Sequence, residues 1–297
     1  MEIRIGELAA LFTALCWTVT ALAFESASRK VGSVAVNIIR LVMALVLLSL
    51  FSYVRRGMFF PLDATAYNWF WLGLSGLAGF VLGDLFLFKA FTVIGSRLSM
   101  LMMTLVPPIA AIIGWLLMGE VLSWLNILGM TLTLSGIALV IFNRQKNKLQ
   151  PVNKVPLKGL LYALGGAVGQ ATGLVLSKFG MADYDAFSAT QIRVIAGIIG
   201  FSIIIHVFRR WTAVGNAMKQ QKPMLLMLLG ATFGPFLGVS SSLIAVQNTA
   251  TGIASTIMSI TPILIIPPTL IFFKQKVSWK ELAGAVISVC GVALFFI

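Results

Sequence analysis

The fold is indicated by residues 79–142, which read GFVLGDLFLFKAFTVIGSRLSMLMMTLVPPIAAIIGWLLMGEVLSWLNILGMTLTLSGIALVIF. Shifted by 155 positions without a gap, this stretch aligns with residues 234–297, and 12 of the 64 aligned pairs are identical. Because apolar residues match easily in hydrophobic sequences, the informative identities are those of glycine, proline and tryptophan. They are Gly79 with Gly234, Gly83 with Gly238, Pro107 with Pro262, Trp124 with Trp279, Gly129 with Gly284, and Gly136 with Gly291. The sequence therefore predicts an internal duplication.

The duplication extends toward the N-terminus with a slightly different shift. A shift of 153 positions pairs Arg40, within NIIRLVMA, with Arg193, within TQIRVIAG. We therefore predict a first repeat at residues 1–143 and a second at 158–297, joined by the basic linker RQKNKLQPVNKVPL at 144–157.

The composition places the chain in a membrane. It is 59% hydrophobic and 10% charged, whereas soluble domains are about 45–50% apolar and about 25% charged. A membrane-spanning helix needs about 20 apolar residues. We predict an all-α integral membrane fold with ten transmembrane helices, two inverted repeats of five. The ten segments lie near residues 5–24, 34–54, 68–91, 98–119, 124–143, 158–178, 187–208, 224–246, 251–273 and 278–297.

The first apolar segment also has features of a cleaved signal peptide. Arg4 precedes it, and the triplet Ala21-Leu22-Ala23 is similar to a signal-peptidase site. We expect the segment to be retained as a helix, because the repeat gives it a counterpart in the second half.

An odd number of helices in each repeat predicts that the two halves enter the membrane in opposite directions, with a binding site between them. The predicted loops on one side hold 15 cations, against four on the other, Arg4, Arg55, Arg56 and Lys178. The positive-inside bias then places both termini outside and residues 144–157 in the cytoplasm. We expect a multi-pass protein of the cell (inner) membrane. The net charge of +13 follows from this bias, so no nucleic-acid partner is expected.

The quoted stretch resembles the EamA-type repeat of the drug/metabolite transporter superfamily. The shared pattern is an Ala-aromatic end to the third helix, a Pro-broken fourth helix, a Gly-Glu turn and spaced glycines in the fifth. The second copy departs at the turn, where Lys274-Gln275 stands in place of Gly119-Glu120. The resemblance implies the fold of a ten-helix carrier. Members of this superfamily are similar to exporters of amino acids, nucleosides, sugars and drugs, so the resemblance does not identify the substrate.

We predict a secondary transporter that moves a small metabolite, an amino acid or a related small anion or zwitterion, by alternating access and in the direction of export. No GxxxxGK[ST] motif is present to bind ATP, so direct ATP drive is not expected. A proton is a candidate coupling ion. The partners expected are the small-molecule substrate and the lipid bilayer, and the protein is a monomer or a homodimer. Neither a cofactor nor a metal is expected.

The sequence allows two other functions. A cationic-drug and proton exporter would use Asp84 or Glu7 to bind its substrate. A membrane enzyme or scaffold is less favoured, because an enzyme should cluster His, Asp, Glu or Cys residues at membrane depth. This chain has one His and scattered carboxylates, so we expect that it is not an enzyme.

Charged residues inside the apolar segments are the first candidates for a site, because each costs about 2.5–3.5 kcal/mol there. Arg40 and Asp84 are expected at similar depth on helices of opposite direction, and Asn37 lies one turn before Arg40 on the same face. Three hypotheses compete for Asp84: an ion pair with Arg40, a proton-coupling carboxylate, and a weaker pair with Lys89. The ion pair with Arg40 is preferred.

Arg193 has no corresponding carboxylate. The equivalent of Asp84 in the second half is Val239, which is followed by Ser240, Ser241 and Ser242. Thr190 precedes Arg193 as Asn37 precedes Arg40. We therefore expect Arg193, nearer the outside, to bind an anionic group of the substrate. The alternative for both arginines is that they snorkel to the membrane surface.

Proline and polar residues complete the candidate site. Pro107 and Pro262 should break the fourth and ninth helices and free backbone carbonyls, which is tolerated only beside protein or a wet cavity. The other candidate substrate-binding residues are Trp17, Gln170, Gln247, Ser241, Ser255 and Ser259. Glycines spaced four apart, Gly165, Gly169 and Gly173 among them, are interpreted as positions of close helix packing.

Overall fold

The computed structural model describes residues 5–118, 123–146, 156–248, 254, 257–272 and 278–294. These residues are helical almost throughout and contain no strand, as predicted. In the first half the elements are α1 (Ile5–Val31), α2 (Ser33–Arg56), α3 (Ala66–Gly76), the π-helix η1 (Leu77–Gly83), α4 (Asp84–Met102), the 3₁₀-helix η2 (Met103–Leu105), α5 (Val106–Met118) and α6 (Trp124–Lys146).

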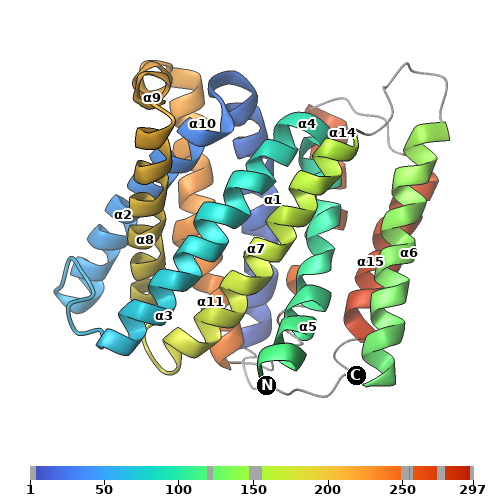
Figure 1. The fold of residues 1–297 in the computed structure, drawn as a ribbon, viewed down its shortest axis with the longest axis horizontal. Coiled ribbons are helices and arrows are strands. Elements are labelled where there is room, and N and C mark those ends of the chain that lie inside the picture. Colours follow the sequence, from blue (N-terminus) through green and yellow to red (C-terminus); the bar gives the residue numbers. More distant parts are fainter. Residues whose placement is uncertain are drawn as a thin grey trace.

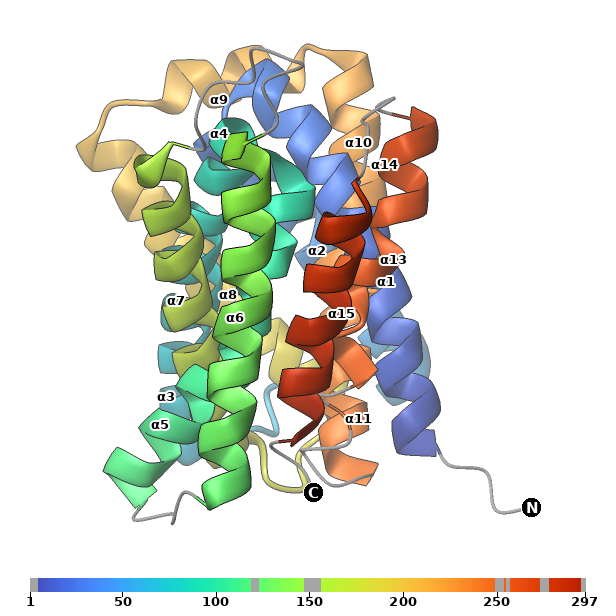
Figure 2. The same cartoon turned by 90° about the vertical axis from the view of Figure 1, so that its right-hand side faces the viewer.

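The second half repeats this order with more interruptions. Its elements are α7 (Leu157–Met181), α8 (Ala186–Val207), α9 (Trp211–Met218), α10 (Gln221–Ala231), the π-helix η3 (Thr232–Val239), α11 (Ser240–Asn248), α13 (Thr261–Leu264), α14 (Ile266–Phe272) and α15 (Trp279–Ala293). The long helices stand side by side as a bundle, and α9 lies across one of its ends (Figures 1 and 2). Most of the predicted linker, residues 147–155, lies outside the described residues.

Six helical segments are long and apolar enough to cross a membrane: Ile5–Val31, Ser33–Arg56, Ala66–Ala110, Leu157–Met181, Ala186–Val207 and Gln221–Asn248. Shorter apolar helices cover Ile127–Val140 and Thr261–Ile271. The segment Ala66–Ala110 covers the third predicted helix and part of the fourth. The backbone turns between the two at Gly95, whose φ of 82° suits glycine. The predicted all-helical fold with apolar spans is therefore confirmed, whereas the number of ten spans stays a prediction.

Helices α6 and α15 show the symmetry of the duplication directly. Thr133 Oγ1 donates to the carbonyl of Ser288, and Ser288 Oγ donates to the carbonyl of Thr133, each at 3.3 Å. The two residues are one repeat shift apart. A Cβ on Gly136 would lie 2.6 Å from the carbonyl oxygen of Gly284, so the helices need glycine to approach this closely. The pair runs antiparallel (Figure 2).

The halves interleave because the first helix of each packs on the third helix of the other. A Cβ on Gly169 of α7 would lie 2.6 Å from the Cα of Gly83, and one on Gly173 would lie 2.9 Å from the Cα of Gly79. In the same way α1 packs against α10, η3 and α11, where a Cβ on Gly238 would lie 3.1 Å from the ring of Trp17. The glycines predicted to allow close packing do so. The two repeats therefore share one core.

A π-helix occurs at the same place in each half. Moving η1 by the repeat shift of 155 places it on residues 232–238, which η3 covers. The segments end just before Asp84 and Ser240, respectively, and Pro235 lies inside η3. π-Helical turns are rare and are often found at functional sites. The duplicated π-helices therefore indicate a functional site in the space between them.

Candidate functional site

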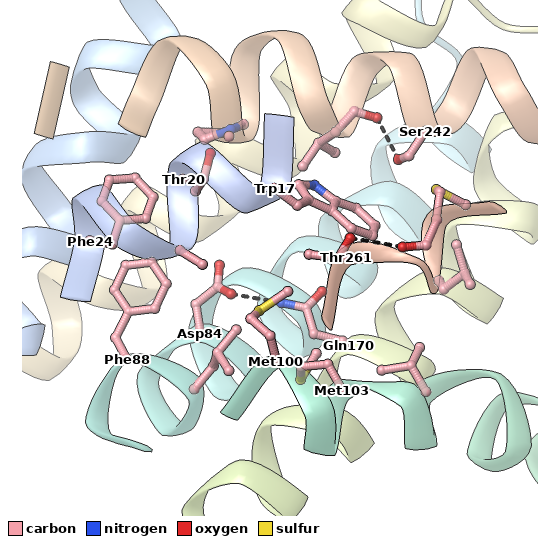
Figure 3. A pocket seen from close by; sticks show the side chains of 18 of the residues that line it. Trp17, Thr20, Phe24, Asp84, Phe88, Met100, Met103, Gln170, Ser242 and Thr261 are labelled. Atoms are coloured by element: carbon pink, nitrogen blue, oxygen red, sulfur yellow. Dashed lines mark hydrogen bonds between the residues drawn. The ribbon is translucent and has the colours of Figure 1, made fainter. Parts of the chain in front are cut away.

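A cavity of about 180 Å³ lies between the two halves, beside both π-helices and both proline breaks. Its wall is mostly apolar, and its ionisable lining residues in the described part of the chain are Arg40, Asp84 and Arg193. Figure 3 shows Asp84 and Gln170 joined at its centre, with Phe24 and Phe88 on one side and Trp17 and Thr261 on the other. Within the described ranges no three His, Cys, Asp or Glu side chains gather as a metal site.

Arg40 and Asp84 form the buried ion pair that the sequence predicts. Arg40 Nη2 donates to Asp84 Oδ2, and Arg40 Nε donates to Asn37 Oδ1 at 3.1 Å. Gln170 Nε2 donates to Asp84 Oδ1 at 2.7 Å. Arg40 is only 3% exposed, so it does not snorkel. Lys89 is exposed, which leaves the alternative pair with Asp84 unformed.

Three phenylalanine rings enclose the Arg40 guanidinium. Its carbon lies 5.3 Å from the ring centroid of Phe24, 5.6 Å from that of Phe80 and 4.7 Å from that of Phe88. These distances suit cation–π attraction, which is stronger where water is excluded. The sequence analysis missed these rings, because phenylalanine within an apolar helix carries no signal that distinguishes a cavity wall from a lipid-facing surface.

Arg193 lies in the same cavity, close to Asp84. Its guanidinium carbon is 5.0 Å from the centroid of the Phe80 ring, the ring that Arg40 also contacts. The charge of Asp84 attracts both arginines. Arg193 is 6% exposed, and its buried Nε has no hydrogen-bond partner among the described residues. It is therefore a buried cation with unused donors, and it does not snorkel.

Of the three serines that follow Val239, Ser242 lines the same cavity as Arg193. The hydrogen bonds of the described residues do not join Arg193 to Ser240, Ser241 or Ser242. Ser242 instead donates to the carbonyl of Val239 at 2.7 Å. Arg193 is close to η1 because Gly76 and Gly79 let α8 approach: a Cβ on Gly79 would lie 3.3 Å from Arg193 Nη2.

Five of the remaining candidates line the cavity. They are Trp17, Gln170, Ser259, Pro107 and Pro262. The proline breaks have the predicted form: the 3₁₀-helix η2 precedes Pro107, and α13 begins with Pro262 in its first turn. The polar backbone of both breaks therefore borders the cavity.

Four described candidates do not line the cavity, and one of them, Asn37, contacts Arg40 instead. Thr190 is buried and donates to the carbonyl of Ala186 at 2.8 Å, and Ser241 is buried but does not line the cavity. Gln247 Nε2 donates to the carbonyl oxygens of Ala182 at 3.3 Å and Tyr184 at 2.9 Å. Ser255 lies outside the described residues.

A buried carboxylate that was not predicted from the sequence joins α1 to α4 near one end of the bundle. Glu25 is 1% exposed, and its Oε2 accepts from the backbone N–H of Ser96 at 2.8 Å, directly after the turn at Gly95. Its Oε1 pairs with Arg29 at 2.9 Å. Because α1 continues to Val31 instead of ending at residue 24 as predicted, Glu25 lies within the helix. Its spacing of four from Arg29 was the available signal.

The opposite end is joined by exposed ion pairs. Arg55 pairs with Asp185 at 2.8 Å and Arg56 with Asp63 at 2.5 Å, which connects the end of α2 to the loops that follow α2 and α7. Burial acts to raise the pKa of Asp63, but hydrogen bonds from Arg56 and Tyr184 outweigh it and hold the pKa below its ordinary value. Asp63 is therefore ionised at neutral pH.

Comparisons with known proteins agree on the fold. The model of a family described as the EamA-like transporter family matches residues 4–142 and again residues 157–297. A solved structure, titled only as the crystal structure of a protein, has a TM-score of 0.62 and 16% sequence identity; the match covers 97% of this chain and 95% of that one. At this identity the likeness concerns the fold alone. No curated protein matches.

Proposed function

Because the chain belongs to the EamA-like transporter family, we propose that it is a secondary transporter that exports a small metabolite by alternating access. The substrate is an amino acid or a related small anion or zwitterion. The observation that supports this most directly is Arg193, a cation in a cavity between the two halves with donors that no described residue uses. An arginine fork suits a carboxylate or a phosphate.

The cavity supports a metabolite over a cationic drug. Asp84 already has Arg40 on one oxygen and Gln170 on the other, and Glu7 does not line the cavity. Sites for drug-sized ligands enclose about 300–1,000 Å³, whereas this cavity encloses about 180 Å³. A drug exporter is therefore the weaker candidate. We propose Asp84 as the carboxylate that carries a coupling proton, since it is the acidic lining residue of the described chain.

We infer a topology of ten membrane spans in two inverted repeats. The antiparallel, reciprocal contacts of α6 with α15 support the inversion. The end of the bundle that carries α9 also holds Arg209, Arg210, Lys219 and Lys222, and this excess of cations favours the cytoplasm. At the opposite end Arg55 and Arg56 are balanced by carboxylates. In this proposal both termini face the outside.

The transport function is tested by counterflow in proteoliposomes. Vesicles loaded with unlabelled members of a metabolite library should accumulate the labelled form of the substrate, with and without a pH gradient. Vesicles that contain no protein are the control for leak. If no member of a library rich in amino acids and organic acids exchanges, the proposed function is wrong.

The orientation is tested with a reporter fused after Ile297. A reporter that is active only in the cytoplasm should stay silent there, and the same reporter inserted within residues 147–155 should be active. A strong signal from the C-terminal fusion would reverse the assignment of the two ends and leave the fold unchanged.

A further inference from the structure

The charges of the cavity narrow the substrate class beyond the proposed function. Two guanidiniums, those of Arg40 and Arg193, and the carboxylate of Asp84 face the cavity, so its ionisable lining among the described residues has a net charge of +1. Residues 249–253 and 255–256, which the structure does not describe, contain no Asp or Glu. A bound monoanion would make the site neutral.

An ammonium group finds no comparable partner. Each oxygen of Asp84 already has a hydrogen bond from the protein, and both arginines stand beside it. A cation that approaches Asp84 therefore approaches two like charges as well. The net charge of +1 in the cavity therefore disfavours a cation, and we expect an ammonium group to lower the affinity by about tenfold or more.

The hydroxyl groups in the wall do not replace a carboxylate. Thr104, Ser242 and Thr261 each donate to the carbonyl oxygen three residues earlier in the chain, that of Leu101, Val239 and Met258 respectively. Their oxygens offer only neutral acceptors to a ligand. Neutral oxygens can solvate an ammonium but do not offset the positive charge of the cavity.

The remaining surface accepts an apolar group. Beyond the charged cluster the cavity is bounded by aromatic rings and by the flexible side chains of methionine. Methionine adapts to ligands of different shape, and phenylalanine offers flat apolar area. The wall therefore supplies one anion-binding end and an apolar remainder, within about 180 Å³.

We propose that the cavity selects small monocarboxylates with an apolar body and no ammonium group over amino acids with the same skeleton. This inference rests on the proposed transport function. The proposed function allows both anions and zwitterions as substrates, and this inference selects the anions.

The test is a series of four ligands that share one phenyl group and differ in charge. They are 3-phenylpropanoate, phenylalanine, 2-phenylethylamine and 3-phenylpropanamide, and their binding to the purified full-length protein is measured by calorimetry and by the shift in thermal unfolding. We expect 3-phenylpropanoate to bind at least about tenfold more tightly than phenylalanine. The amine and the amide should bind more weakly than either.

Two variants assign the preference to the cavity. Arg193→Gln should reduce the difference between 3-phenylpropanoate and the amide to within about twofold, because the free guanidinium is lost. Lys89→Gln removes an exposed cation from the helix that carries Asp84, outside the cavity lining. It should leave all four affinities unchanged.

The outcomes separate this inference from the proposed function. Phenylalanine that binds as tightly as 3-phenylpropanoate would overturn the monocarboxylate class, and its counterflow would leave the transport function standing. The absence of binding by any of the four would also overturn the class. A tenfold preference for 3-phenylpropanoate in a protein that exchanges no solute would support the binding class and contradict transport.

Discussion

Replacing Arg193 with glutamine is expected to lower substrate affinity by roughly tenfold to hundredfold. A hydrogen bond between charged groups contributes about 1.5–3 kcal/mol, which corresponds to that range. The buried guanidinium has no hydrogen bond to a described residue, so its donors are available to the substrate. The loss should be measured as a higher half-saturating concentration in counterflow and as a weaker Kd in detergent.

Two measurements separate a binding role from a structural one. Arg193→Gln removes a buried cation whose Nε has no hydrogen-bond partner among the described residues, so the unfolding temperature should not fall. Arg193→Lys keeps the charge but loses the planar fork, so its affinity should lie between those of the other two proteins. Near-normal affinity in a well-folded Arg193→Gln protein would contradict the assignment.

Substitutions at Asp84 should damage the protein more than substitutions at Arg40. Asp84→Asn leaves two buried arginines without a counter-ion, and breaking a buried ion pair from one side typically costs about 3–5 kcal/mol. Arg40→Gln leaves Asp84 attracted to Arg193 and hydrogen-bonded to Gln170. We expect the Asp84→Asn protein to unfold at the lower temperature and to be recovered in lower yield.

A double-mutant cycle tests whether the two residues act as a pair. The Arg40→Gln/Asp84→Asn protein should be more stable than the sum of the single losses indicates, by about 1–3 kcal/mol. A charge swap, Arg40→Asp with Asp84→Arg, should recover part of the transport that the single variants lose. Additive losses would show that the two residues are not coupled. Equal damage from the two single substitutions would contradict the role of Asp84 as the counter-ion of both arginines. Lys89→Gln is the matched control for loss of a charge.

The features that could be predicted from the sequence are those whose residues cost much free energy inside a membrane helix. A charge at membrane depth is expensive, so Arg40 and Asp84 could be paired from their depth alone. Pro107 and Pro262 could be recognised as breaks because proline lacks an N–H donor. Glycine, proline and tryptophan identities revealed the duplication, because these residues rarely coincide by chance in an apolar sequence.

The parts that could not be predicted depend on how closely two backbones approach. Gly76 and Gly79 bring α8 close enough for Arg193 to contact the ring of Phe80 in the other half, and no pattern in the sequence indicates this approach. The π-helices also have no sequence signal of their own. Glu25 was placed beyond the end of the first helix because a charged residue ordinarily marks a boundary.

The paired hydrogen bonds of Thr133 and Ser288 have a consequence for the origin of the chain. The hydroxyl of each residue donates to the carbonyl oxygen of the other, and the two residues are one repeat shift apart. A chain with only five helices could form this interface with an identical copy, provided that the copy lay upside down beside it. Before the two copies were fused, such a protein would have needed to insert into the membrane in both directions. Fusion would let each half keep a single direction of insertion, and it allows equivalent positions to differ, as Asp84 and Val239 do.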